Sequence, residues 1–430
     1  MARRSPLQLV HLEAEALLLP YGPAVSPAES LSNAITDQST ISIELVATFG
    51  ELEMEYAALR KTCVILDQPN RGLIELTGPD RLDFLNRMLT QELKGLKPGQ
   101  VCRSFWLNRK GRIDADLRVV HLEDRTLLEL DAHAVARTLQ GLAAFIITED
   151  VRVQDLTEST HRLALHGPTA ELLLNQSTRS EMPDLKSPED PGFSLEPAHA
   201  ITRAIARTET IIFRDDTTGE PGYELMIPTA DAARVYQHLV ETGSDPNQGT
   251  PEALTDPATH TLGSRVKLRQ AGWHAYNIAR LEAGTPLYNI DFGPTSLPAE
   301  TGVLLDRVSF TKGCYLGQEI VARMHARGHP KQMLVALKLA RQFNLTDSTP
   351  RQPDSGAAVL RKEATDTAPG DPVGSVTSST TSPMLGAASI CFAQVKHELA
   401  VPGTQLQVVT NDTLVAADVQ PTLSFWSRPR

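Results

Sequence analysis

Cysteine is scarce in this chain of 430 residues. The four cysteines are Cys63, Cys102, Cys314 and Cys391, and no two of them form a CxxC pair. Such wide spacing argues against a disulfide framework and against a self-contained zinc or iron–sulfur site. A chain with few, scattered thiols is typical of a reducing compartment, so we expect a cytoplasmic protein.

Long apolar runs and an excess of positive charge are also missing. The apolar stretch near the N-terminus is interrupted by His11, Glu13 and Glu15, so it is not a signal-peptide core, and no segment is a membrane-spanning run. The net charge of -11 argues against a surface that binds nucleic acid or anionic membrane as a whole. We therefore expect no membrane and no direct nucleic-acid partner.

The hydrophobic fraction of 41% allows real cores, and the pattern along the chain divides it into three parts. Residues 1–48 are expected to be a loose lead-in, because residues 20–41 are rich in Pro, Ser, Thr and Asn. Residues 49–330 alternate strand and helix signals, which predicts an α+β region of two subdomains. Residues 331–430 carry five short strand-like runs separated by turn residues, which predicts a small β-barrel or sandwich.

The α+β region contains an internal pseudo-repeat. A strand, a Gly-Pro pair and a helix follow one another twice, around Gly78-Pro79 and around Gly167-Pro168. A hairpin is expected between the two copies, with its turn at Lys110-Gly111. Further elements are predicted as helices over residues 50–62, 133–145 and 230–241, strands over 208–213 and 223–227, and an irregular insert over 243–262.

The octet Lys312-Gly313-Cys314-Tyr315-Leu316-Gly317-Gln318-Glu319 is the most informative stretch. Its glycines allow tight turns, and the residues that follow predict a helix opening. A thiol beside a lysine and near a helix N-terminus ionises more readily than a free one. The same pattern also fits a small buried cysteine in a turn. A protease-like nucleophile is not expected, because no His and Asp partners lie nearby in sequence.

Across its fixed positions this octet resembles the signature of the YgfZ-type folate-binding proteins, which are relatives of the aminomethyltransferase (T-protein) of the glycine cleavage system. Further stretches are similar to family motifs in the same order along the chain: residues 55–60, 77–85, 89–93, 218–224, 280–288 and 374–383. The resemblance implies a T-protein-like ring of subdomains around a central folate channel, with a C-terminal β-barrel.

The resemblance implies tetrahydrofolate as the cofactor and places its site on five residues: Asp116, Glu220, Tyr223, Glu224 and Arg280. A carboxylate accepts the N–H groups of a pterin in bidentate fashion, and an aromatic ring provides a wall for it. Cys314 would be the functional thiol, in a loop shaped by Lys312, Gly313, Tyr315, Gly317, Gln318 and Glu319. The implied role is support of iron–sulfur cluster assembly or repair in client enzymes, including those that modify tRNA, with these clients as protein partners.

One departure from the T-protein pattern leaves two other functions open. T-proteins carry adjacent aspartates in the hairpin that faces the folate, whereas this chain has Ala115-Asp116-Leu117. The lost carboxylate argues against a folate-dependent one-carbon transferase such as an aminomethyltransferase, although whether the chain is an enzyme stays open. The third hypothesis is a folate-free adaptor that keeps only the scaffold.

A basic segment and a histidine pair are two further candidate sites. Residues 307–331 hold five basic residues (Arg307, Lys312, Arg323, Arg327 and Lys331) and one acid, Glu319, and five minus one gives +4. The segment suits a folate polyglutamate tail, an RNA or a protein partner, or simply a solvated surface. His325 and His329 have helical metal-ligand spacing, but without an HExxH pattern we expect no metal site.

Overall fold

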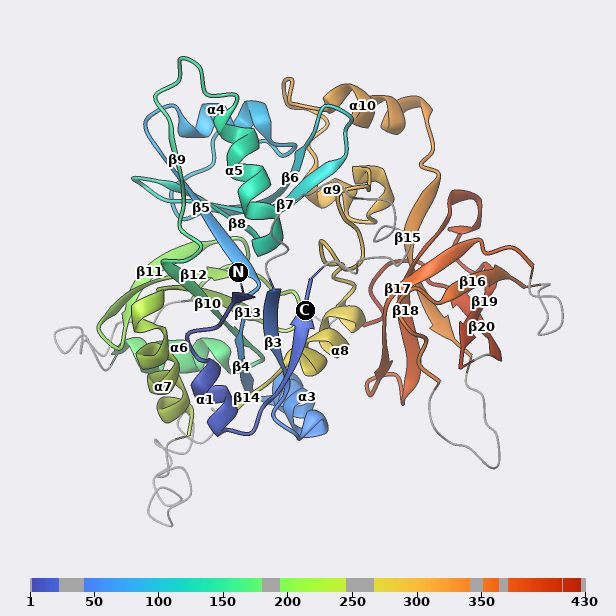
Figure 1. Cartoon of the computed structure of the whole chain (residues 1–430), viewed down its shortest axis with the longest axis horizontal. Coiled ribbons are helices and arrows are strands. Elements are labelled where there is room, and N and C mark those ends of the chain that lie inside the picture. Colours follow the sequence, from blue (N-terminus) through green and yellow to red (C-terminus); the bar gives the residue numbers. More distant parts are fainter. Residues whose placement is uncertain are drawn as a thin grey trace, which may run out of the picture.

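The computed structural model describes residues 2–22, 42–179, 194–244, 267–340, 351–362, 370–411 and 413–426. Figure 1 shows two α+β subdomains stacked on one side of the molecule and a barrel on the other, with α8 between them. The α+β class and the closed C-terminal barrel expected from the sequence are confirmed. Within the described residues, no helix is both long and apolar enough to span a membrane.

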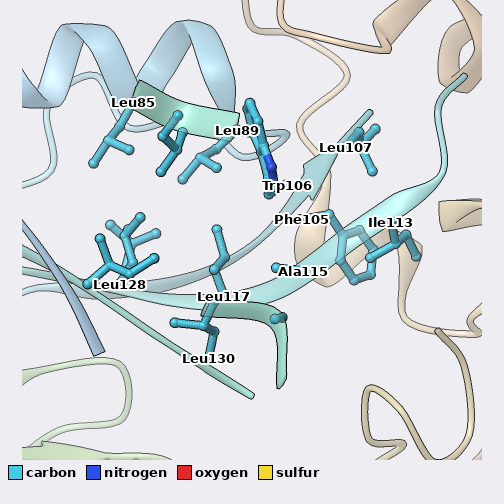
Figure 2. Close-up of a cluster of buried hydrophobic side chains, with 14 of the residues drawn as sticks. Leu85, Leu89, Phe105, Trp106, Leu107, Ile113, Ala115, Leu117, Leu128 and Leu130 are labelled. Atoms are coloured by element: carbon cyan, nitrogen blue, oxygen red, sulfur yellow. The ribbon is translucent and has the colours of Figure 1, made fainter. Parts of the chain in front are cut away.

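The first subdomain is an antiparallel sheet of five strands in the order β6-β7-β8-β5-β9. Its strands are β5 (Arg71–Thr77), β6 (Val101–Leu107), β7 (Ile113–His121), β8 (Thr126–Asp131) and β9 (Arg152–Asp155), and its helices are α4 (Arg81–Met88) and α5 (Val135–Ala143). Leu85 and Leu89 face Leu117 and Leu128 across the core (Figure 2). The β6–β7 hairpin turns at Lys110-Gly111, as expected, with Gly111 at a φ of 67°.

The second subdomain is a six-stranded sheet in the order β11-β12-β13-β10-β4-β14. Its strands are β4 (Cys63–Asp67), β10 (Thr160–His166), β11 (Ala200–Ile205), β12 (Thr208–Arg214), β13 (Gly222–Pro228) and β14 (Leu268–Gln270). Its helices are α3 (Leu52–Lys61), α6 (Ala170–Arg179), α7 (Ala232–Gly243) and α8 (Trp273–Ala283). The expected insert over residues 243–262 lies almost entirely outside the described residues.

Both copies of the strand, Gly-Pro, helix arrangement are present, and the glycine has the same task in each. Gly78 has a φ of 101°, and a Cβ there would lie 2.0 Å from the Asp150 carbonyl oxygen. Gly167 has a φ of 132°, and its Cβ would lie 2.4 Å from the Thr62 oxygen. Only glycine fits a positive φ combined with so close an approach of backbone, so the repeat reflects two equivalent turns.

The C-terminal barrel closes through six strands, in the order β15-β18-β17-β16-β19-β20. They are β15 (Gln332–Leu339), β16 (Ala358–Arg361), β17 (Gly374–Ser382), β18 (Ala388–Lys396), β19 (Gln405–Thr410) and β20 (Thr413–Val419). The last strand was not predicted, because Ala416, Ala417 and Asp418 weaken its alternating pattern. Between the second subdomain and the barrel, the chain forms α9 (Leu304–Arg307), α10 (Gln318–Arg327) and a 3-10 turn, η6 (Pro298–Glu300).

The N-terminal region differs from the loose lead-in expected over residues 1–48. Its described part forms α1 (Gln8–Glu13) and a three-stranded sheet of β1 (Ala2–Arg3), β2 (Leu17–Tyr21) and β3 (Ser42–Thr48). Buried Ile43 and Leu45 hold β3, and His11 Nε2 lies 2.8 Å from Asp67 Oδ2. The rich Pro and Ser content that suggested looseness belongs mainly to residues 23–41, which lie outside the described residues.

Candidate functional site

A pocket opens where the N-terminal sheet and both α+β subdomains meet. About 650 Å³ of space free of protein atoms lies at this pocket, a volume that includes open solvent. Four aromatic side chains line it, from three separate parts of the chain: Tyr21, Trp273, Tyr276 and Tyr288. Its polar lining includes Arg71, Arg118, Glu129 and Glu224. Flat walls with a few convergent charged groups suit a planar heterocycle that carries N–H donors.

Glu224 reaches this pocket because of strand alternation in β13. Its neighbours Tyr223 and Leu225 point into the core of the second subdomain, so Glu224 projects from the opposite face. The cationic Arg162 Nη1 lies 3.5 Å away and His166 Nε2 lies 4.0 Å away. Burial lowers the pKa of His166 to about 4, so this imidazole is neutral near neutral pH. Burial raises the pKa of Glu224 to about 7, although Arg162 and Arg118 oppose the rise. Near neutral pH, this carboxyl can therefore either donate or accept a hydrogen bond.

Glu129 is a second carboxylate of the pocket lining, and its surroundings lower its pKa, whereas those of Glu224 raise it. Arg71, Arg118 and Arg162 all form ion pairs with it, the last two at 3.1 and 3.3 Å. Burial alone would raise its pKa, but these three guanidinium groups lower the pKa of Glu129 to about 2. Glu129 therefore stays ionised and committed to arginines. Asp67, the third carboxylate of the lining, is hydrogen-bonded to His11 and His161, which leaves Glu224 as the carboxyl available to a ligand.

The polar face of β7 carries Asp114, Asp116 and Arg118, while Ala115 lies on its core face. Ala115 is fully buried among apolar side chains of the first subdomain (Figure 2). An aspartate at position 115 would therefore point into the core and not toward the ring interior. The departure from the paired aspartates is thus a weaker argument against a transferase than the sequence suggested.

Asp116 is not part of the pocket lining. Its Oδ1 accepts a hydrogen bond from Arg307 Nε at 3.0 Å. Burial lowers the pKa of Arg307 to about 10, even though Asp116 favours its charged form. Glu224 is at one end of a chain of ion pairs that runs through Arg162, Glu129 and Arg118 to Asp215. Asp116 pairs with Arg307 and is not part of that chain.

Glu220 and Tyr223 are in the predicted motif but lie away from the pocket lining. Glu220 is buried 3.6 Å from Arg60 Nη1, in a cluster where Arg60 also contacts Glu282 at 2.5 Å. The Tyr223 hydroxyl donates to Glu171 Oε2 at 2.6 Å on the far side of the sheet. The motif thus brings one of its three predicted residues, Glu224, to the pocket.

Arg280 lies at a joint between α8 and the barrel. It is fully buried, with Nη1 2.5 Å from Asp291 Oδ2 and its guanidinium 5.6 Å from the centre of the Phe392 ring. The barrel residue Thr377 donates to the other Asp291 oxygen at 2.8 Å. These contacts hold the barrel against the ring, while the pocket lining contains neither Arg280 nor Asp291.

The octet forms a loop in which the side chains of Lys312 and Tyr315 are anchored and the thiol of Cys314 is exposed. Lys312 Nζ donates to the carbonyl oxygens of Asn86, Leu89 and Gln91 at 2.6, 2.8 and 2.8 Å, around the C-terminal end of α4. Its pKa is lowered to about 8 by burial. Tyr315 is buried in the first core. Cys314 is exposed, so the alternative of a small buried cysteine does not hold.

The two glycines of the octet differ in their surroundings. Gly317 has a φ of 81°, and a Cβ there would lie 2.9 Å from the Asn108 carbonyl oxygen, so it seats the loop against the β6–β7 turn. Gly313 has open space around it. Gln318 and the exposed Glu319 begin α10, as expected. Within the described parts of the chain, no three His, Cys, Asp or Glu side chains gather in a way that could hold a metal ion.

Several pocket residues were missed by sequence reasoning. The aromatic walls Trp273, Tyr276 and Tyr288 come from α8 and the segment after it, and Tyr21 comes from the region expected to be loose. Arg118 and Glu129 sit at polar positions of otherwise apolar strands, which was a usable signal. A charged side chain at a buried strand position needs an oppositely charged or hydrogen-bonding partner. Two such side chains of opposite charge on different strands therefore predict a polar binding site where the strands meet.

The ring of two α+β subdomains with a barrel, built around an aromatic pocket with one available carboxyl, defines a protein of the T-protein type. Residues 38–250 match the model of the GCVT N-terminal domain, and residues 342–425 match the model of the glycine cleavage T-protein C-terminal barrel domain. The chain belongs to the glycine cleavage T-protein superfamily.

Similar proteins extend over nearly the whole chain. An aminomethyltransferase of Desulforamulus reducens is 28% identical over 406 residues, covering 93% of each chain. An aminomethyltransferase of Bacillus subtilis is 26% identical over 387 residues, covering 90% of this chain and 93% of the relative. The crystal structure of the glycine cleavage system aminomethyltransferase T of Bartonella henselae has the same fold, with a TM-score of 0.75, 22% identity and full coverage of both chains.

Proposed function

We propose that this protein binds tetrahydrofolate in the aromatic pocket and uses the Cys314 loop to support iron–sulfur cluster assembly or repair in client enzymes. The observation that carries the folate half is Glu224, a buried carboxyl without a close bidentate partner, at a pocket walled by tyrosines and a tryptophan. Tetrahydrofolate offers the complementary groups, since its pterin combines a flat ring with adjacent N–H donors.

The chain's own residues have distinct tasks in this proposal. Glu224 accepts the pterin N–H groups, and Tyr276 and Trp273 provide the flat walls. The positive charge of Arg71 and Arg118 at the lining favours an anionic ligand, although Glu129 neutralises part of it. Bound folate would supply a one-carbon carrier or a reductant at the ring interior.

The thiol half of the proposal is supported by how the octet loop is built. Lys312 and Tyr315 are buried and Gly317 packs the loop against the β6–β7 turn, yet Cys314, which lies between Lys312 and Tyr315, is exposed. A loop held at three points to present one thiol suits transient cluster ligation or redox chemistry at a partner surface. A reducing compartment such as the cytoplasm, as proposed from the cysteine pattern, would keep this thiol free.

The test has two stages, both under anaerobic conditions. Calorimetric titration of tetrahydrofolate into the wild type and Glu224→Ala should show binding that weakens by about tenfold or more in the variant. Wild-type protein and Cys314→Ser are then added to a purified enzyme whose cluster has been damaged by oxygen, and recovery of activity is followed. Absence of folate binding by the wild type would favour the folate-free adaptor and overturn the first half. Equal recovery with both proteins would overturn the second.

A folate-dependent aminomethyltransferase is the second candidate. It is favoured by the printed names of the relatives and by the placement of Asp114 and Asp116 on one face of β7. Formation of methylene-tetrahydrofolate from an aminomethylated carrier protein discriminates between the two. Turnover that is lost in Asp116→Asn and kept in Cys314→Ser would establish the transferase and displace the cluster role.

A further inference from the structure

The tip of the β6–β7 hairpin and the first turn of α10 form one continuous surface beside the Cys314 loop. A Cβ on Gly111 would lie 2.9 Å from the Ile320 Cβ, so the hairpin tip and the helix are in direct contact. Arg109 and Lys110, which precede that glycine, are exposed next to the helix. Cys314 is four residues before the start of α10, which limits its distance from Gln318 to about 14 Å.

This surface is basic, but not through the residues that the sequence suggested. Arg307 and Lys312 are buried, one paired with Asp116 and the other bound to carbonyl oxygens. The exposed cations of this surface are instead Arg109 and Lys110 from the hairpin tip, together with Arg323 and Lys331. In the described parts of the chain, none of these four cations has a carboxylate within 4.0 Å. Glu319, in the first turn of α10, is an exposed carboxylate on the same surface. Four cations against it are still a local exception on a chain of net charge -11.

An apolar groove of about 240 Å³, part of it open to solvent, lies between η6, α9 and α10. Leu304, Ile320 and Met324 line it. Leu305, in the same helix as Leu304, is 77% exposed. At the edge of the groove, His325 stacks on Phe310 with ring centres 3.9 Å apart. Exposed apolar side chains around a groove with a charged rim are typical of protein interaction sites.

We propose that this surface, defined by Arg109, Lys110, Leu304, Ile320, Arg323 and Met324, docks an acidic segment of a partner protein. An apolar side chain of the segment packs over the open mouth of the groove, and the carboxylates of the segment lie against the free cations. Only the identity of this partner as an iron–sulfur client rests on the function proposed above. Docking there brings the partner to within reach of Cys314.

Charge and shape favour a protein segment over a nucleic acid. A long polyanion experiences the field of the whole chain, which is negative, whereas a short acidic segment is affected mainly by charges within about 10 Å. The groove is lined by aliphatic and thioether side chains and by one ring, His325, which already stacks on the ring of Phe310. Base stacking thus lacks a platform here.

The first experiment measures peptide binding by fluorescence anisotropy at low ionic strength. The probe is a synthetic 12-residue peptide of alternating Glu and Leu, and matched peptides replace Glu by Lys or Leu by Ser. The acidic apolar peptide should bind, and Arg109→Glu/Lys110→Glu should weaken it by about tenfold. Met324→Ser should weaken it severalfold without a charge change. The matched control Lys61→Glu/Lys267→Glu carries the same charge change on exposed lysines of α3 and the β14 region, and should bind like the wild type.

The second experiment locates the docked peptide relative to Cys314. The peptide carries a terminal cysteine as a mixed disulfide with thionitrobenzoate. The Cys314 thiolate attacks the peptide sulfur, a new disulfide forms, and the thionitrobenzoate thiolate leaves and is measured by absorbance. Docking should accelerate this exchange over that of glutathione carrying the same leaving group, and Arg109→Glu/Lys110→Glu should remove the acceleration. The Cys314→Ser variant measures the background rate of thionitrobenzoate release caused by the other cysteines.

Equal binding of the acidic and basic peptides, no binding of the acidic apolar one, or equal affinity of the hairpin and control variants would each overturn the proposal. Tighter binding of a single-stranded RNA 12-mer than of the peptide would assign the surface to nucleic acid instead. Tetrahydrofolate is titrated into the same variants. If the wild type binds the peptide but does not bind tetrahydrofolate, the folate function alone is refuted. Intact folate binding without docking would refute this inference alone.

Discussion

Replacing Glu224 by glutamine should remove a pH dependence that the protein otherwise shows in both folate binding and stability. The carboxyl has a pKa of about 7, raised from 4.5 mainly by burial. If the ionised form accepts the pterin N–H groups, only the ionised fraction is competent to bind. The apparent affinity should then fall by about tenfold between pH 8 and pH 6, following that fraction.

The same shift affects the free energy of unfolding with a defined sign. A carboxyl whose pKa is higher in the folded state binds its proton more tightly there, so its stabilising contribution is full below about pH 4.5 and is lost as pH rises through about 7. A shift from 4.5 to about 7 corresponds to at most roughly 3 kcal/mol. Glutamine resembles the protonated form, so Glu224→Gln should be more stable than the wild type at pH 8 and similar to it at pH 5.

Denaturant unfolding and calorimetric folate titration at half-unit steps from pH 5 to 8.5 test both expectations. Glu171→Gln is a suitable control, because Glu171 contacts Tyr223 on the far side of the sheet and not the pocket. Folate affinity that is flat over this range in the wild type, or an equal slope in Glu224→Gln, would refute the assignment of Glu224 as the titrating anchor. A stability difference between variant and wild type that does not change with pH would refute the raised pKa.

Three further predictions concern the octet loop. Lys312→Met removes three hydrogen bonds from a charged donor to buried carbonyl oxygens and should cost about 3 kcal/mol in the free energy of unfolding, seen as a lower thermal midpoint; an unchanged midpoint would contradict the anchoring role. Gly317→Ala should cost about 1–3 kcal/mol because of its positive φ and the 2.9 Å approach to Asn108, whereas Gly313→Ala should be neutral within about 0.5 kcal/mol, and equal effects in denaturant unfolding would refute the difference. Cys314→Ser should leave stability and folate affinity unchanged, since the side chain is exposed and outside the pocket, and a large loss of either in calorimetry would show that the thiol has a structural task.

The sequence by itself determined the local elements and the class of fold. Gly78 and Gly167 encode two equivalent turns, and the helices and strands around them follow from hydrophobic periodicity. Periodicity and turn chemistry act between residues close in sequence, so they can be read without knowing the fold. The octet indicated an important loop for the same reason, since its glycines, lysine and cysteine are neighbours.

Only the tertiary structure decided which side chains meet. Glu220 and Glu224 are four residues apart, yet one lies with Arg60 and the other at the pocket, because Glu220 belongs to the loop before β13 and Glu224 to the strand. Lys312 is buried while Arg109, two hundred residues earlier, takes its place on the surface beside α10. The pocket joins Tyr21, Glu224 and Trp273 from three distant segments. Such contacts depend on how sheets and helices pack at long range, and local sequence carries no record of that packing.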